Sequence, residues 1–126
     1  MKPELLDRTK AFALRIIALV DALPATPTGR VIGNQILRSG TSVGANYRSC
    51  QRGKSRADFI AKLAIAEEEA DESVYWLELL VESSILPQER LLPLLTEARE
   101  ITAILTASRI KANQNSEKEG EGKRKK

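Results

Sequence analysis

Apolar residues recur at three- and four-residue steps in four stretches of the chain, which is the periodicity of amphipathic helices. These stretches are Pro3 to Leu23, Thr28 to Gln51, Arg56 to Ser84, and a last one from Pro87 or Gln88 to Ala112. No segment alternates apolar and polar residues over the length of a β-strand. The pattern therefore predicts an all-α protein.

Short breaks separate the four stretches: LPATPTG after the first, GKS after the second and SSILPQ after the third. Proline, glycine and serine interrupt helices and form turns. Thr28 is a predicted N-cap of the second helix, and Ser55 with Asp58 three residues later is typical of a capped start for the third. Four amphipathic helices with short connections favour an antiparallel up-down-up-down four-helix bundle.

The last fourteen residues, NQNSEKEGEGKRKK, contain no apolar side chain and end in four basic residues. Such a segment has too little apolar surface to offset the entropy of ordering it. We therefore expect residues 1–112 to form the bundle domain and residues 113–126 to be a disordered tail with a basic end. The tail is either a solvated extension or a non-specific phosphate-binding segment.

The segment RSGTSVGANYRSCQRG, Arg38 to Gly53, is rich in glycine and arginine and could be a phosphate-binding loop or a helix. It lacks the spacing of a Walker A or a Rossmann loop, and no apolar strand precedes it. Projected at about 100° per residue, the arginines of the second stretch fall within about 80° of one another, opposite the apolar residues. The projection favours a helix with an arginine stripe facing away from the core.

Glycines in a helix interior each cost about 1 kcal/mol relative to alanine, so those of the second helix need a reason. Gly40 and Gly44 lie on one side, where they permit close approach of a neighbouring backbone or of another subunit. In the third helix, VYWLELLV is apolar around most of its circumference. Surplus apolar surface of this kind marks an interface. We predict a homo-oligomer whose interface includes Gly40, Gly44, Tyr75, Trp76 and Leu79.

The chain contains no histidine and one cysteine, Cys50. Ser-His-Asp and Cys-His catalysis, His-based zinc chemistry and an intrachain disulfide are therefore excluded. The acidic run EEEADE points its carboxylates to different sides of a helix, which is typical of a solvated face. We expect no enzyme activity, no metal site and no cofactor. No signal peptide or membrane-spanning run is evident, so we expect a cytoplasmic protein.

Charge is segregated along the chain although the net charge is only +3. No acid occurs between Ala22 and Ala57, whereas no base occurs between Leu63 and Glu89. The basic region holds the candidate phosphate contacts, which are Arg30, Arg38, Arg48, Arg52, Lys54 and Arg56. Two alternatives follow: these residues bind nucleic acid, or they pair with the acidic cluster Glu67–Glu72 of a neighbouring subunit.

The stretch LRSGTSVGANYRSCQRGKSRADFIAKLAIAEEEADESVYWLELL resembles the bacterial four-helix-bundle family named after the 23S ribosomal RNA intervening-sequence protein. The family pattern of RS-x-x-S-x-x-x-N, a G-(R/K)-S turn and DF-x-x-x-L-x-x-A is matched by Arg38, Ser39, Ser42, Asn46, Ser55, Asp58, Phe59, Leu63 and Ala66. The chain departs from the pattern where the family often has NIAEG and this sequence has NYRSCQRG.

This resemblance implies a homopentamer of four-helix bundles. The family is similar to the accessory variability protein of diversity-generating retroelements, a pentamer that partners a reverse transcriptase and binds nucleic acid. Residues and resemblance together lead to a non-enzymatic accessory protein that binds nucleic acid, most simply RNA, through the basic face of its second helix. The alternative is a protein-interaction oligomer held together by basic and acidic helices of adjacent subunits.

Overall fold

The computed structural model describes the backbone of residues 3–125 and the side chains of residues 4–120. Its four helices are α1 (Pro3–Ala22), α2 (Pro27–Gln51), α3 (Arg56–Glu82) and α4 (Gln88–Lys125). No strand occurs within residues 3–125. The predicted all-α class and the four predicted helical stretches are confirmed, and the fold is consistent with a four-helix bundle.

The helix starts follow capping chemistry. The α2 N-cap is Thr26, whose hydroxyl accepts a hydrogen bond from the Gly29 N–H at 3.1 Å. The predicted cap, Thr28, is wrong because Pro27 already occupies the first helical position, where its fixed φ and missing N–H are tolerated. The α3 cap was predicted correctly: the Ser55 hydroxyl accepts from the Asp58 N–H at 3.1 Å.

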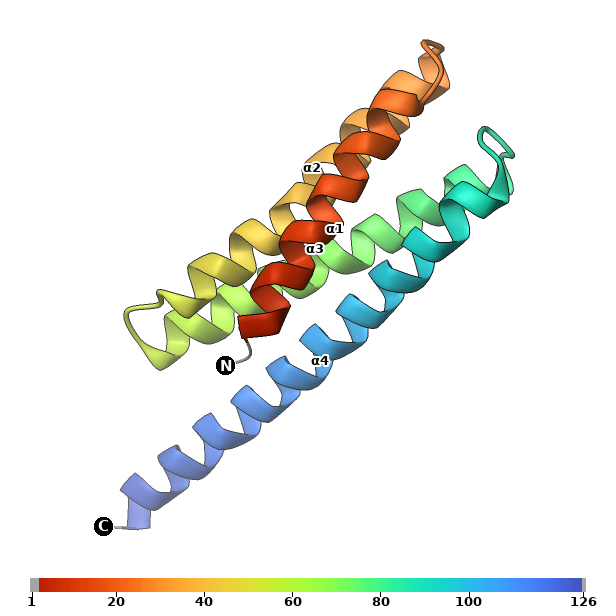
Figure 1. Cartoon of the computed structure of the whole chain (residues 1–126). Helices are drawn as coiled ribbons and strands as arrows, with labels where there is room; N and C mark the ends of the chain where they lie inside the picture. The colour runs from red at the N-terminus through yellow and green to blue at the C-terminus, as the bar shows by residue number, and fades with distance from the viewer. Residues whose placement is uncertain (1–2, 126) are drawn as a thin grey trace.

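The turns between consecutive helices lie at alternate ends of the molecule (Figure 1). The most extensive packing is between α2 and α3, followed by α3 with α4 and α1 with α2, whereas α1 and α4 touch at few positions. Beyond the turn between α2 and α3, the last part of α4 continues alone (Figure 1). The bundle is thus tight around α2 and α3 and looser between α1 and α4.

The core is almost entirely aliphatic. Its largest fully buried side chains come from all four helices and include Phe12, Ile16, Ile36, Leu63, Leu77, Leu80, Leu91, Ile101 and Leu105. Burying one such side chain contributes about 1.5–3 kcal/mol, so this set accounts for the cohesion of the bundle. A buried hydroxyl pair crosses the α2–α3 contact, where Ser73 Oγ donates to Ser39 Oγ at 2.9 Å.

The glycines of α2 face α1 of the same chain. A Cβ added to Gly40 would lie 2.8 Å from Cγ1 of Ile16, and one added to Gly44 would lie 3.2 Å from Oγ1 of Thr9. The close approach expected for Gly40 and Gly44 is therefore made inside the chain. Helix α1 occupies the space that the missing side chains leave, and the part of Gly40 and Gly44 in an interface between subunits stays a prediction.

The C-terminal segment differs from the prediction. Helix α4 continues from Ala112 through Lys125, where the sequence led us to expect disorder from residue 113. Extending an existing helix needs no new nucleus, and the glutamate, lysine and glutamine of this segment are good helix formers. The composition argument considered only apolar burial and so missed that the segment inherits a helix that has already begun.

One ion-pair cluster joins α1 to α4. The Arg8 guanidinium donates to both carboxylate oxygens of Glu97, at 2.8 and 2.6 Å, and to Glu100 at 2.6 Å. Its hydrogen bonds are the main reason that the pKa of Glu97 is lowered, against the opposing effect of burial. Because α1 and α4 share few other contacts, Arg8 has a large part in holding them together.

This cluster predicts a specific pH dependence of stability. A lowered folded-state pKa of Glu97 means that its ionised form stabilises the fold at neutral pH, and that this contribution disappears as pH falls through the lowered pKa. We expect Arg8→Gln to reduce the free energy of unfolding at pH 7 by up to about 1 kcal/mol, and the difference from the wild type to shrink as pH falls toward 3. Urea denaturation at both pH values measures this.

Lys10→Gln serves as the control, because Lys10 is an exposed cation on the same helix with no ion pair among the described residues. The urea denaturation curve of Lys10→Gln should follow that of the wild type at both pH values. If Arg8→Gln lost as much stability on acidification as the wild type does, the assignment to Glu97 would be wrong.

Candidate nucleic-acid interface

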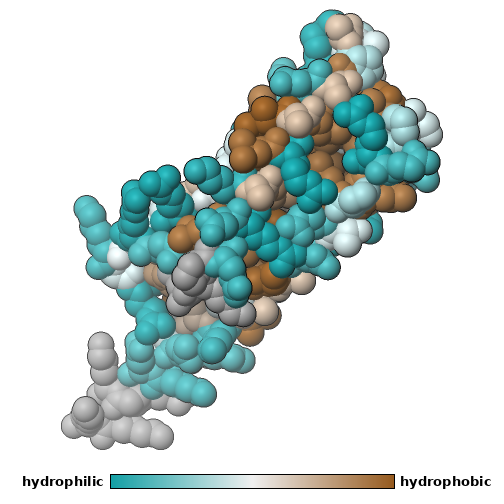
Figure 2. All heavy atoms as spheres, in the orientation of Figure 1, coloured by the Kyte–Doolittle hydropathy of each residue, from teal (hydrophilic) through white to brown (hydrophobic). Residues whose placement is uncertain are grey.

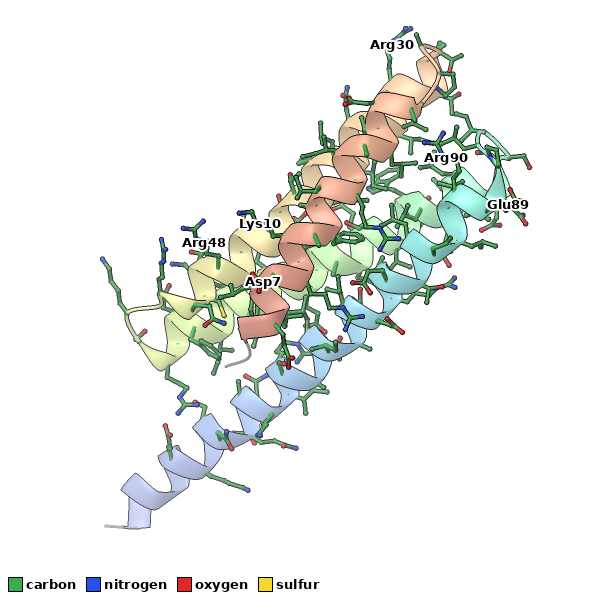
Figure 3. All side chains as sticks on the ribbon, in the orientation of Figure 1. Asp7, Lys10, Arg30, Arg48, Glu89 and Arg90 are labelled. Carbon is green, nitrogen blue, oxygen red and sulfur yellow. The ribbon has the colours of Figure 1, made fainter. Side chains whose placement is uncertain are left out.

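The predicted arginine stripe does lie on the exposed face of α2. Arg30, Arg38, Arg48 and Arg52 are all exposed. The stripe is long, however: Arg30 and Arg48 are separated by 18 residues, or about 27 Å along the helix. Figure 3 shows Arg30 near the end where α2 begins and Arg48 toward the opposite end. The six predicted phosphate contacts therefore do not form one site.

Arg38 has partners within its own chain. Its guanidinium donates to Glu69 at 3.1 Å and to Glu72 at 2.5 Å, both on α3. The hydrogen bond from Arg38 is the main reason that the pKa of Glu72 is lowered, and Trp76 adds a further hydrogen bond from Nε1 at 3.2 Å. Arg38 therefore joins α2 to α3 and is not a free cation.

Arg56 and Arg30 are also engaged, at opposite ends of the molecule. Arg56, in the first turn of α3, forms an ion pair with Glu119 of the α4 extension at 2.8 Å. Arg30 donates to the backbone carbonyl of Ala25 at 3.4 Å, in the turn before α2. Neither contact is buried, but both lower the availability of these predicted site residues.

Arg48, Arg52 and Lys54 remain as an exposed group at the end of α2 and in the turn that follows. Within the described part of the chain, none of the three side chains forms an ion pair. Arg52 ends the helix, and its backbone N–H caps the carbonyls of Ser49 and Cys50. We call Arg48, Arg52 and Lys54 the basic end.

The acidic cluster of α3 is largely used inside the chain. Glu69 and Glu72 bind Arg38, as described above. Glu67 accepts hydrogen bonds from Thr106 and Arg109 of α4, and Glu78 pairs with Arg99 of α4 at 3.1 Å. Glu68, Asp71 and Glu82 have no ion pair among the described residues. Within the cluster Glu67–Glu72, Glu68 and Asp71 are thus the acids that remain for a neighbouring subunit.

The sequence did not reveal these partners because a helical projection shows which way a side chain points but not which helix it meets. Arg99 and Arg109 lie 21 and 42 residues from their glutamates. One signal was available in principle. When two helices joined by a tight turn run in opposite directions, the residue numbers of facing positions add up to a nearly constant sum. The pairs Glu78–Arg99 and Glu67–Arg109 both fit this register.

The predicted interface residues of α3 differ in exposure. The Tyr75 side chain is 54% exposed, while Trp76 and Leu79 are half-buried. The Tyr75 and Trp76 rings meet edge to face, with their centroids 5.1 Å apart. Tyr75 therefore stands out as a rigid aromatic surface feature, supported by the tryptophan beside it.

The described residues also bear on the presence of a reactive cysteine, a metal site and a membrane-spanning helix. Cys50 is buried, and burial raises its pKa to about 11, so it is a protonated core side chain. No cluster of three or more potential ligands is placed to hold a metal ion within residues 4–120. No helix in the described range is long and apolar enough to cross a bilayer.

The fold and the basic end define a class: an all-α, four-helix protein with a concentrated positive surface at one end of its second helix. Residues 2–107 match the family described as 23S rRNA-intervening sequence protein, and the chain belongs to that family. The resemblance stated from the motif Arg38–Ala66 is thereby confirmed at the level of the family.

A solved structure supports the same placement. It is the crystal structure of a protein with unknown function from the S23 ribosomal protein family of Bacteroides thetaiotaomicron. That chain is 42% identical to this one, with a TM-score of 0.76, over 82% of this chain and 95% of the other. No curated protein matches the chain.

Proposed function

We propose that this protein is a non-enzymatic nucleic-acid-binding protein that contacts phosphates of RNA through the basic end, Arg48, Arg52 and Lys54. Such contacts supply affinity and orientation and carry little sequence information. The name of the family, 23S rRNA-intervening sequence protein, links its members to RNA and is consistent with this proposal.

One observation carries the proposal: the exposed side chains of Arg48, Arg52 and Lys54 form no ion pair among the described residues, whereas Arg38 and Arg56 are paired. The nearest interaction of this kind is electrostatic, between Asp58 and Lys54. Figure 2 shows that the end of the molecule toward which α2 finishes is mostly hydrophilic, whereas apolar side chains gather farther up the same face. A cluster of unpaired cations attracts a polyanion through release of its counterions.

We further propose that copies of the chain assemble through exposed apolar side chains as antiparallel bundles, in the pentamer that the family resemblance implies. Tyr75 supports an interface on α3, and Leu14, 59% exposed on α1, offers a second apolar point. Assembly would repeat the basic end around a ring and add avidity to weak individual contacts. Mass measurement by light scattering tests the subunit count.

The resemblance also names a class of partner, a reverse transcriptase. Co-expression of this chain with the reverse transcriptase of a diversity-generating retroelement, followed by size-exclusion chromatography, tests that part of the proposal. Co-elution would support the partnership, and separate elution at micromolar concentration would remove it. The RNA-binding proposal stands apart from this result.

The alternative function is an oligomer that binds only protein, with basic α2 against acidic α3 of the next subunit. The pairs Arg38–Glu72, Arg109–Glu67 and Arg99–Glu78 reduce its support, because they lie within one chain. Glu68, Asp71 and Glu82 are the acids that such an interface would have to use.

A salt titration of RNA binding separates the two functions. With fluorescently labelled single-stranded RNA, we expect measurable binding at 50 mM salt, and a log–log slope of affinity against salt of about −2 for three phosphate contacts per chain. Fluorescence anisotropy measures both quantities. No binding at low salt by a correctly assembled oligomer would exclude the nucleic-acid function.

A further inference from the structure

A cavity of about 570 Å³ lies at the end of the bundle where α1 begins. Among the described residues of helix α1, Leu5 lines its wall. The other walls come from Tyr47 of α2, from Phe59 and Leu63 of α3, and from α4 between Ile104 and Asn115. Helices α2, α3 and α4 thus supply most of the described lining of this groove.

The dimensions of the groove suit a small ligand. Its wall on α4 runs from Ile104 to Asn115, which is 11 steps along the helix, or about 16 Å. Pockets for small molecules and cofactors have volumes of about 300–1,000 Å³ and are lined mainly by apolar side chains with a few polar groups. Most residues around this groove are apolar, so a hydrocarbon chain would find apolar contacts along its length.

The polar residues of the groove carry positive or neutral side chains. Ser108, Lys111 and Asn115 follow one another on α4 at three- and four-residue steps, which places them on one side of the helix. Arg56 lies on α3. No acidic residue is among the described lining of the cavity; Glu119 pairs with Arg56, and Glu4 lies in an adjoining hollow with Leu5 and Ile104.

Lys111 is the cation available to a ligand. It is exposed, and it has no ion pair among the described side chains. The Ser108 hydroxyl donates to the Ile104 carbonyl at 2.9 Å and is therefore occupied. A negatively charged group above the groove would contact Lys111 of α4. The same group would be able to replace Glu119 as the ion-pair partner of Arg56.

We propose that this groove binds a single-chain anionic amphiphile, with its hydrocarbon chain between Phe59 and Ile104 and its carboxylate head at Lys111. The apolar walls select for the chain, and the cations select for the sign of the head group. The site is distinct from the basic end and does not depend on the RNA-binding proposal.

Dodecanoate, used below its micelle concentration, is the direct probe. Isothermal titration calorimetry of the full chain is expected to show saturable binding. Dodecyltrimethylammonium, which has the same chain and the opposite charge, should bind at least tenfold more weakly. Acetate, which has the head group alone, should not bind measurably. Equal affinity for the two amphiphiles would mean that the positive groups do not select the head group, and the proposal would fail.

Two pairs of variants locate the binding. Ala107→Trp should fill the groove and abolish binding, whereas Ala103→Trp, an exposed alanine one turn earlier on α4 and outside the lining, should leave it unchanged. Lys111→Gln should weaken dodecanoate at least tenfold, and Lys118→Gln, outside the groove, should not. Circular dichroism confirms that each variant is folded.

The groove could instead be covered by a second copy of the chain. In that case the assembled protein would not bind dodecanoate, and Ala107→Trp would lower the mass measured by light scattering. Either absence of binding to the assembled protein, or binding that Ala107→Trp leaves intact, would overturn the proposal.

Discussion

Charge reversal of Arg48 and Arg52 together is expected to lower RNA affinity at least tenfold at 50 mM salt. Each substitution removes one phosphate contact and adds one repulsion. The salt dependence should weaken as well, because two fewer contacts change the log–log slope by about 1.4 for a single strand. The double variant Arg48→Glu, Arg52→Glu should still fold, since both side chains are exposed and unpaired among the described residues.

The matched control is Arg30→Glu, Arg90→Glu. It changes the net charge by the same amount, and both residues are exposed. Figure 3 shows Arg30 and Arg90 toward the end of the molecule opposite to the end nearer Arg48. We expect this variant to retain most of the affinity and the slope of the wild type. Equal losses in both variants would show that net charge, rather than the basic end, governs binding.

Assembly must be checked in both variants, because a dissociated oligomer would also lose avidity. Light scattering on the same samples answers this. If the Arg48→Glu, Arg52→Glu protein dissociates and also loses RNA binding, the result favours the alternative function. In that alternative, the basic α2 of one subunit packs against the acidic α3 of the next. If it stays assembled and loses RNA, the basic end is the contact surface.

The sequence predicted local structure well because local structure depends on nearby residues. Ser55 and Asp58 define the start of α3 by themselves, and the periodicity of the apolar residues predicts each helix. The partner of Arg38 was beyond this reasoning. Its projection showed an exposed side chain beside the core, but whether α3 of the same chain or of another would meet it depended on the packing of the helices.

The same limit explains the candidate site. Six cations shared one stretch of sequence, and only the structure separated the paired Arg38 and Arg56 from the unpaired basic end. Glu119 was assigned to a disordered tail, so its pairing with Arg56 could not be predicted. The groove beside Lys111 was missed for a related reason, since its lining comes from four helices far apart in the sequence rather than from any motif.

Gly40→Ala is expected to destabilise the fold by about 1–3 kcal/mol, although alanine is the better helix former. The new methyl group would lie 2.8 Å from Cγ1 and 3.0 Å from Cγ2 of Ile16, closer than real Cβ contacts. Ile16 is fully buried and β-branched, so its side chain has few other rotamers available. Relief of the clash therefore requires α1 and α2 to move apart, which urea denaturation would detect as a lower midpoint.

Gly120→Ala is the same substitution in open space, because no atom beyond the adjoining stretch of its own helix lies within 4 Å of the position that its Cβ would take. Neither glycine has a positive φ, so backbone strain does not distinguish them. We expect Gly120→Ala to leave the midpoint unchanged, with at most a small gain in helix content. The difference between the two variants isolates the α1–α2 contact from helix propensity. A stabilising Gly40→Ala would mean that α1 does not lie against this face of α2, and that Gly40 is open to another subunit as the sequence first suggested.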